Sequence, residues 1–263
     1  MPRARRRGGA AANAAAPAGE RIAKVIARAG LGSRREAEAW IAAGRVAVDG
    51  ATIASPALNV TPERIVTVDG RALPTADRAR IWLFHKPRGC LTAARDTRGR
   101  ATIYDRLGPS FPRAVPVGRL DFNSEGLLLL TNDGGLARRM SHPKNAWPRR
   151  YRVRAHGRID QAALDRLKDG ITVAGIAYGP IAATLDRAES ANVWLTMTLA
   201  EGKNREVRRV LEHLGLAVNR LIRVGFGPFA LSDIGRGHVR EVPRKETEKL
   251  ARSLPDVDAD RRR

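Results

Sequence analysis

From Ile81 onward, short strand-like apolar segments alternate with fewer helical ones, and this alternation limits the fold more than any other feature. Turn-forming residues separate the segments, as expected for strands joined by loops. Helical spacing occurs at residues 161–168, behind a capping Asp160, and at residues 205–214, before Gly215. The pattern predicts an α+β fold on a mixed, largely antiparallel sheet, with strands at residues 81–84, 114–117, 127–131, 151–155, 171–174 and 193–199.

A smaller unit precedes this region. Residues 22–29 carry apolar side chains at helical spacing, and Ser33 with Glu36 forms an S-x-x-E capping box. In such a box the hydroxyl and the carboxylate satisfy free amides at the start of a helix. The second helix should end at Gly44, and a strand-like segment then leads into a turn at residues 49–50. We predict two short helices and a small sheet.

The overall charge favours a polyanionic partner. The chain has 48 Lys and Arg residues against 27 Asp and Glu residues, a formal charge of +21. Cations placed near phosphates release condensed counterions, so such a chain gains affinity for nucleic acid without reading its sequence. A compositional bias toward arginine is the alternative explanation, because lysine supplies few of these cations.

Several cations fall within the small N-terminal unit. Arg34 and Arg35 follow the capping serine, in a first helical turn where acidic residues are usual. The free amides of a helix N-terminus also favour phosphate. We therefore prefer a phosphate-binding surface to an ordinary solvated face, with candidate residues Lys24, Arg34, Arg35 and Arg45.

The composition suggests five parts. We expect a basic arm, the small helix-and-sheet unit, a linker, the larger α+β domain and a charged tail at residues 1–19, 20–75, 76–80, 81–245 and 246–263. The arm contains no acidic residue, so an organellar transit peptide is an alternative interpretation of it.

The sequence also excludes several classes of site. The single cysteine, Cys90, rules out an internal disulfide and a multi-thiolate zinc site, and it favours a reduced, cytoplasmic setting. The apolar runs, such as the four leucines at residues 127–130, are far too short to span a bilayer, so we expect no membrane association. The histidines show no metal-binding spacing and no nucleotide-binding motif occurs. We therefore expect neither a metal nor a cofactor.

Asp121 is a candidate functional residue because of the sequence around it. Asp121 ends the sequence Gly-Arg-Leu-Asp at residues 118–121, between two strand-like segments. An aspartate in a glycine-bounded loop usually serves only to form a turn. The residues alone would therefore not identify Asp121 as catalytic.

Two resemblances change that interpretation. Residues 24–30 (KVIARAG), 32–37 (GSRREA), 44–46 (GRV) and 48–50 (VDG) resemble an S4 domain, a small RNA-binding fold. Further along, the chain resembles the RsuA/RluB/RluE/RluF family of pseudouridine synthases. The matching segments are residues 86–89 (KPRG), 118–121 (GRLD), 126–134 (GLLLLTNDG), 142–143 (HP) and 201–209 (EGKNREVRR).

The family resemblance implies both an activity and site residues. Members isomerise uridine in RNA without a cofactor: the bond from N1 to C1′ breaks, the base turns, and C5 bonds to C1′. Asp121 would be the catalytic nucleophile or base, and Arg208 its ion-pair partner. Tyr151 would stack on the target base, and Arg119 would contact phosphate or act as a wedge when the base is extruded.

Within the family, residues 201–209 and 220–224 are most similar to members that act on the large ribosomal subunit. The expected partner is therefore ribosomal RNA, free or in an assembly intermediate, bound by a monomer. The alternative is an S4-type RNA-binding or ribosome-assembly factor without turnover. The joint presence of Asp121, Tyr151 and Arg208 argues for the enzyme, because a binding module has no need of these three residues together.

Overall fold

The computed structural model describes residues 19–255, which divide into two compact units with a boundary between Asp77 and Arg78. The expected basic arm, apart from residue 19, and the end of the expected tail lie outside the described residues. We describe each unit by itself.

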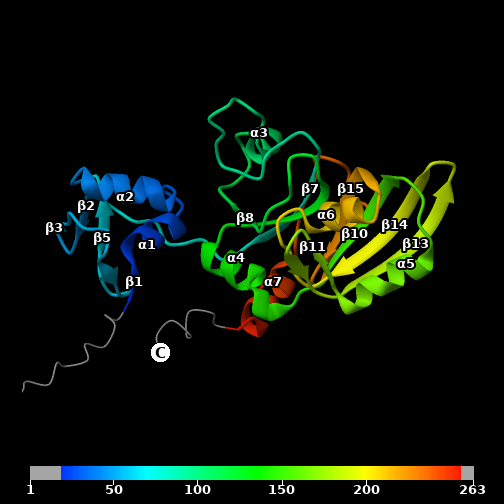
Figure 1. Cartoon of the computed structure of the whole chain (residues 1–263). Coiled ribbons are helices and arrows are strands. Elements are labelled where there is room, and N and C mark those ends of the chain that lie inside the picture. The colour runs from blue at the N-terminus through cyan, green and yellow to red at the C-terminus, as the bar shows by residue number, and fades with distance from the viewer. Residues whose placement is uncertain (1–18, 256–263) are drawn as a thin grey trace, which may run out of the picture. The chain divides into compact units, whose positions relative to one another are not determined.

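The N-terminal unit contains two helices and two small sheets (Figure 1). Strands β3, β2, β5 and β6 form a four-stranded antiparallel sheet in that order, and β1 pairs with β4. The elements are β1 (Glu20–Arg21), α1 (Ile22–Arg28), α2 (Arg34–Ala42), β2 (Val46–Val48), β3 (Ala51–Thr52), β4 (Asn59–Val60), β5 (Val66–Val68) and β6 (Arg71–Ala72).

Local sequence signals set this unit. The Ser33 hydroxyl accepts from the Glu36 amide at 3.2 Å, and the Glu36 carboxylate accepts from the Ser33 amide at 2.7 Å. The predicted capping box is therefore confirmed, and it fixes the start of α2. Asp49 and Gly50 both have positive φ, which suits the tight turn between β2 and β3. Ile22, Ile26, Ile41 and Val46 form the centre of the core.

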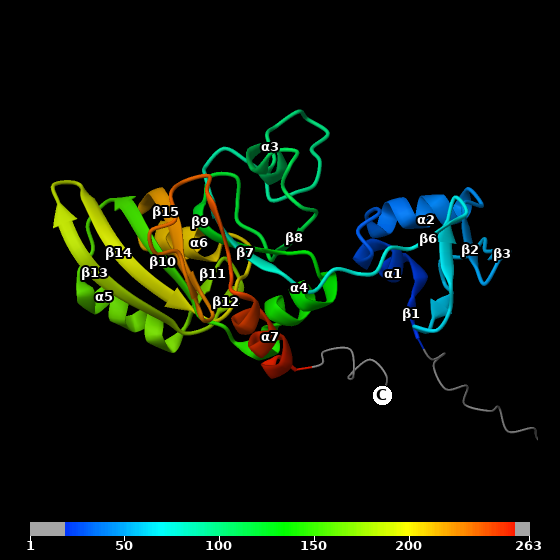
Figure 2. The same cartoon turned by 180° about the vertical axis from the view of Figure 1, so that it is seen from behind.

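The larger unit is built on a nine-stranded sheet (Figure 2). Its strands run in the order β13, β14, β10, β15, β9, β7, β17, with β16 paired to β15 and β8 paired to β9. The strands are β7 (Ile81–Lys86), β8 (Val115–Val117), β9 (Glu125–Thr131), β10 (Arg149–His156), β13 (Ile181–Glu189), β14 (Asn192–Leu199), β15 (Ala217–Phe226), β16 (Phe229–Ala230) and β17 (Val239–Glu241). A separate hairpin joins β11 (Ile171–Val173) to β12 (Ile176–Tyr178).

One parallel pairing lies within this otherwise antiparallel sheet. Strands β9 and β15 run in parallel, with Ile222 opposite Glu125 and Arg223 opposite Gly126. The predicted mixed, largely antiparallel α+β fold is confirmed. The helices of the unit are α3 (Ile103–Leu107), α4 (Gly134–Ser141), α5 (Gln161–Asp165), α6 (Glu206–His213) and α7 (Arg244–Ser253).

The sheet is covered differently along its width. Helices α5 and α6 pack on one face of β13, β14, β10 and β15, with Val153, Leu195 and Leu211 fully buried between them. We call this the helix-covered face and its opposite the open face. Strand β9 instead has all seven residues buried, because separate cores lie on its two sides. A strand buried on both faces explains the continuous apolar run at residues 127–130.

The C-terminal segment is more ordered than the sequence suggested. Where a charged tail was expected from residue 246, residues up to 253 belong to α7. Leu250 and Ala251 of this helix, and Leu254 after it, pack against the core beside β7 and β9. Its mostly charged sequence conceals this narrow apolar stripe.

Candidate active site

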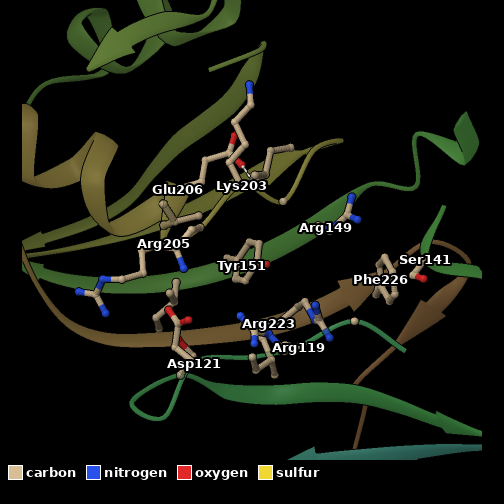
Figure 3. A pocket seen from close by; sticks show the side chains of 18 of the residues that line it. Arg119, Asp121, Ser141, Arg149, Tyr151, Lys203, Arg205, Glu206, Arg223 and Phe226 are labelled. Atoms are coloured by element: carbon tan, nitrogen blue, oxygen red, sulfur yellow. Dashed lines mark hydrogen bonds between the residues drawn. The ribbon is translucent and has the colours of Figure 1, made fainter. Parts of the chain in front are cut away.

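A cavity of about 350 Å³ opens beside β10, on the helix-covered face of the sheet. The loop between β8 and β9 contributes residues 118–121, the loop before α6 contributes residues 202–205, and the strands contribute Tyr151, Leu221 and Arg223. Figure 3 shows Asp121 on its loop at one side of this space and Tyr151 on β10. Segments that are far apart in the sequence thus line the same polar cavity.

Asp121 lies at the turn that follows β8. Its side chain is half-buried and lines the cavity. Within the described part of the chain, its carboxylate makes no hydrogen bond or ion pair. A carboxylate held at a cavity wall without a partner is available to a ligand.

The main chain around Asp121 is held firmly. The five consecutive carbonyl oxygens of residues 120–124 each accept a hydrogen bond. The donors are the Thr92 hydroxyl to Leu120 (2.9 Å), Lys86 Nζ to Asp121 (3.0 Å) and Ser124 (2.9 Å), the Gly89 amide to Phe122 (2.9 Å) and Arg208 to Asn123 (3.2 Å). This loop is therefore fixed from several directions, which restricts where the carboxylate can point.

Lys86 is the most deeply buried of these donors. It ends β7, is 0 % exposed, and donates also to the Pro87 carbonyl at 3.2 Å. Burial lowers the pKa of Lys86, while its electrostatic interactions with Cys90 and Asp121 oppose the shift. A buried ammonium group is tolerated only when its protons have acceptors, and here three carbonyls supply them.

Arg208 contacts the loop that carries Asp121, but it does not form the expected ion pair with the Asp121 carboxylate. Its guanidinium donates to the carbonyl of Asn123 at 3.2 Å and to that of Val218 at 3.1 Å. Burial lowers the pKa of Arg208, as does the charge of Arg205, whereas the charge of Asp121 raises it. Arg208 therefore holds the main chain of the Asp121 loop through a hydrogen bond. It interacts with the Asp121 carboxylate only through its charge.

Tyr151 faces the cavity opposite this loop. It is the cross-strand neighbour of Arg223, so the two side chains lie on the same face of the sheet. Arg223 donates to the Leu127 carbonyl at 2.8 Å and lies over the Phe226 ring at 4.9 Å. Burial lowers the pKa of Arg223, whereas its charge interaction and hydrogen bond with Tyr151 raise it. Tyr151 thus presents an aromatic ring backed by a fixed cation.

The predicted RNA-binding cations divide into exposed residues and residues that already form ion pairs. Arg119 is exposed at the cavity. In the N-terminal unit, Arg34 and Arg35 are exposed in the first turn of α2. Two others are already engaged: Lys24 pairs with Glu20 at 2.5 Å and Arg45 pairs with Asp69 at 2.6 Å.

Comparisons with known proteins agree with this geometry. Residues 80–213 match the family model described as RNA pseudouridylate synthase, and residues 20–71 match the S4 domain. The chain belongs to the RNA pseudouridylate synthase family. The resemblance inferred from the motifs is thereby confirmed.

Relatives of this pseudouridine synthase match along most of its length. It is 42 % identical over 230 residues to an RNA pseudouridine synthase of Rickettsia felis, covering 88 % of this chain and 100 % of the relative. It is 41 % identical over 246 residues to the ribosomal large subunit pseudouridine synthase B of Pseudomonas aeruginosa, covering 90 % of this chain and 63 % of the relative. A crystal structure of a pseudouridylate synthase superposes with a TM-score of 0.61 at 26 % identity, covering 88 % of this chain and 99 % of the other.

Lys86, Arg223 and Glu206, which lie at the cavity or beside the Asp121 loop, were not predicted as site residues, although each falls within a quoted segment: 86–89, 220–224 or 201–209. Glu206 is 3 % exposed, accepts from the Lys203 amide at 2.9 Å and lines the cavity. Burial raises the pKa of Glu206 to about 7, and the charge of Glu201 adds to the shift. The available signal was their position within these segments, and for Lys86 also a charged residue at the end of the apolar strand β7.

Within residues 19–255, no cluster of three or more His, Cys, Asp or Glu side chains is placed to hold a metal ion. The same residues contain no helix with the length and apolarity needed to cross a membrane.

Proposed function

We propose that this synthase converts a uridine of large-subunit ribosomal RNA to pseudouridine, with Asp121 as its catalytic group. The unpaired Asp121 carboxylate, facing the same cavity as Tyr151 on an anchored loop, carries the proposal. The proposed substrate is supported by the relatives in Pseudomonas aeruginosa and Salmonella typhi, whose names specify the large ribosomal subunit. The latter is 40 % identical over 271 residues.

The chemistry assigns separate tasks to the two walls of the cavity. Asp121 acts as nucleophile or base while the bond from N1 to C1′ breaks, the base turns and C5 bonds to C1′, after which C5 loses its proton. Tyr151 stacks on the base that has left its RNA stem, and Arg119 contacts the adjacent backbone at the cavity. Extruding a base costs a few kcal/mol, which such stacking and charge contacts offset.

Arg208 supports the ionised state of Asp121. An enclosed carboxylate tends to take up a proton, and a neighbouring cation opposes this. The two charges already interact in this structure without direct contact. We infer that Arg208 holds the loop through Asn123 and keeps the Asp121 carboxylate negative once RNA closes the cavity.

We assign RNA docking to residues 20–75 and turnover to residues 81–245. In the docking unit, Arg34 and Arg35 offer exposed charge at a helix N-terminus, where phosphate is favoured. Lys24 and Arg45 join them by exchanging their carboxylate partners for phosphate. The enzyme works as a monomer in the cytoplasm, where ribosomal RNA is available to it.

An Asp121→Asn variant tests the catalytic assignment. It keeps the size and polarity of the side chain but removes the charge, so tritium release from 5-tritiated uridine in large-subunit RNA should be abolished. RNA affinity, measured by filter binding, should stay within about twofold, because an uncharged amide still fits the cavity. The matched control is Asp169→Asn, an exposed aspartate outside the cavity, which should release tritium at the normal rate.

Undiminished release by Asp121→Asn would overturn the assignment of Asp121. Absence of release from the unaltered protein, together with tight RNA binding, would favour the alternative of a ribosome-assembly factor without turnover. Release from small-subunit RNA instead would contradict the proposed substrate.

A further inference from the structure

The open face of β10 carries a row of arginines. Arg150, Arg152 and Arg154 alternate with Tyr151 and Val153 along this strand, and all three are exposed. Because neighbouring residues of a strand point to opposite faces, the arginines lie on the side of the sheet away from the cavity. Their spacing is about 7 Å along the strand. This is close to the separation of successive phosphates along an extended nucleic-acid strand.

This row is not paired with acidic side chains in the part of the chain that the structure describes. Within the described residues, no ion pair involves Arg150, Arg152 or Arg154. The nearby carboxylates of β13 are engaged elsewhere, since Asp186 accepts from the Thr196 hydroxyl at 2.8 Å and Glu189 pairs with Arg187. Like charges about 7 Å apart on one face of a strand repel each other. A polyanion bound along the row would remove that repulsion.

An aromatic side chain stands beside the row. Trp194 of β14 is the cross-strand neighbour of Arg154, and the Arg152 guanidinium lies 4.7 Å from the centre of its ring. Trp194 is half-buried, so part of the ring remains accessible on the open face. Thr196 and Thr198 of the same strand add hydroxyl groups between the arginines and β13. Cations interleaved with an aromatic ring are the combination that single-stranded nucleic acid binds.

No helix among residues 19–255 covers this part of the sheet. Helices α5 and α6 pack on the opposite face, as the side chains of Val153 and Leu195 show by their burial among them. Figures 1 and 2 show α5 along a single face of β13 and β14. The arginine row is therefore exposed by the architecture of the unit.

We propose that the open face of β10 and β14 is a second RNA-binding surface, which holds single-stranded RNA outside the segment being modified. Arg150, Arg152 and Arg154 contact successive phosphates, and Trp194 stacks on a base. This inference rests on the proposed function in taking RNA as the partner. An RNA that reaches both faces must pass around an edge of the sheet, so the surface serves long ribosomal RNA and not an isolated stem-loop.

The test uses two RNAs, a long large-subunit RNA and a stem-loop that contains the target uridine. It compares a β10 variant with a control variant that loses the same number of charges. In the triple variant Arg150→Gln, Arg152→Gln, Arg154→Gln, the dissociation constant for a long large-subunit RNA should rise about tenfold at 0.1 M salt. The slope of log affinity against log salt should become shallower by about 2, since each single-strand phosphate contact contributes about 0.7. The steady-state KM and kcat for a stem-loop containing the target uridine should stay unchanged.

The control variant, Arg166→Gln, Lys168→Gln, Arg252→Gln, removes the same three charges from exposed positions beside α5 and on α7. It should leave the salt slope for long RNA unchanged. A second variant, Trp194→Ala, should weaken binding of long RNA about tenfold, and Trp194→Phe should restore most of it, because a phenyl ring still stacks.

An equal loss of affinity in the two triple variants would overturn the proposal in favour of general attraction by net charge. An unchanged salt slope in the β10 variant would also overturn it. If that variant instead lost turnover on the stem-loop, the arginines would belong to the substrate site and the second surface would not exist. Failure of the unaltered enzyme to modify the stem-loop would contradict the proposed function, whereas the binding comparison with long RNA would still stand.

Discussion

The buried ammonium group of Lys86 donates to the main-chain carbonyl of Asp121 at 3.0 Å and leaves the Asp121 carboxylate free. A direct ion pair would tie the carboxylate to the wall of the cavity and reduce its reactivity. A hydrogen bond to the main chain fixes the position of Asp121 and leaves its side-chain carboxylate without a bound partner. Arg208 follows the same principle through the carbonyl of Asn123.

Replacing Lys86 with methionine should lower both turnover and stability. The variant keeps an unbranched side chain but leaves the carbonyls of Pro87 and Ser124 without their buried donor, which costs about 1 to 3 kcal/mol of unfolding free energy. Urea denaturation would measure this loss and tritium release the fall in kcat. Lys245→Met, at an exposed position of α7, is the control and should change neither. Normal kcat in Lys86→Met would show that the loop is held adequately by its other bonds.

Arg208→Met should reduce kcat while leaving RNA affinity nearly intact. A charge-assisted hydrogen bond contributes about 1.5 to 3 kcal/mol, which corresponds to a fall in kcat of about 10- to 160-fold if it is needed in the transition state. Single-turnover kinetics would separate this step from binding. The adjacent Arg209→Met, at a less buried position of α6, should retain normal kcat. A loss confined to KM would instead assign Arg208 to RNA binding.

Gly126→Ala should disrupt the parallel contact between β9 and β15. Gly126 has φ of +107°, and a Cβ there would meet the Arg223 carbonyl oxygen at 2.3 Å. Strain and overlap together should cost about 2 to 6 kcal/mol of unfolding free energy. Gly134→Ala is the control, because a Cβ at that helical position has open space around it. Thermal denaturation showing equal stability for the two variants would contradict the close approach of these strands.

Glu206 should make the stability depend on pH. Its pKa of about 7 in the folded protein exceeds the value of about 4.3 in an unfolded chain, so the folded state binds more protons between these values. The stabilising contribution is full below about pH 4 and is lost as the pH rises through about 7. Denaturation at pH 5 and pH 8 should show Glu206→Gln gaining stability relative to the unaltered protein at pH 8, by up to about 3 kcal/mol.

Glu212→Gln, at an exposed position on the same helix, should show no such gain. A constant difference between Glu206→Gln and the unaltered protein across this pH range would mean that Glu206 stays charged in the fold.

The exposed arginines of α2 should contribute to the salt dependence of RNA binding. The double variant Arg34→Gln, Arg35→Gln should make the slope of log affinity against log salt shallower by about 1.4 to 1.8, because each phosphate contact contributes about 0.7 to 0.9. Arg64→Gln with Arg71→Gln removes the same charge from the same unit and should have a smaller effect. Equal effects of the two pairs would indicate that RNA responds to the unit's net charge and not to the start of α2.

Local signals predicted the elements whose boundaries depend on nearby residues. The capping box before α2, the Asp160 cap of α5 and the helix ending before Gly215 all appear in the structure. Strands β13 and β15 were not predicted as strands. The open face of β13 carries small and charged residues that interrupt an apolar pattern, and β15 is stabilised by β9, more than 90 residues earlier in the chain.

The sequence by itself determined the family and supplied the site candidates, because the ordered motifs at residues 86–89, 118–121 and 201–209 match that family in residue type and order. Only the tertiary structure decided which side chains position the loop that carries Asp121. The bond from Lys86 to the Asp121 carbonyl, and the attachment of Arg208 to Asn123 in place of the expected ion pair, depend on strands and helices that meet only after folding. Hydrogen bonds form between neighbours in space, and sequence spacing does not fix which neighbours those are.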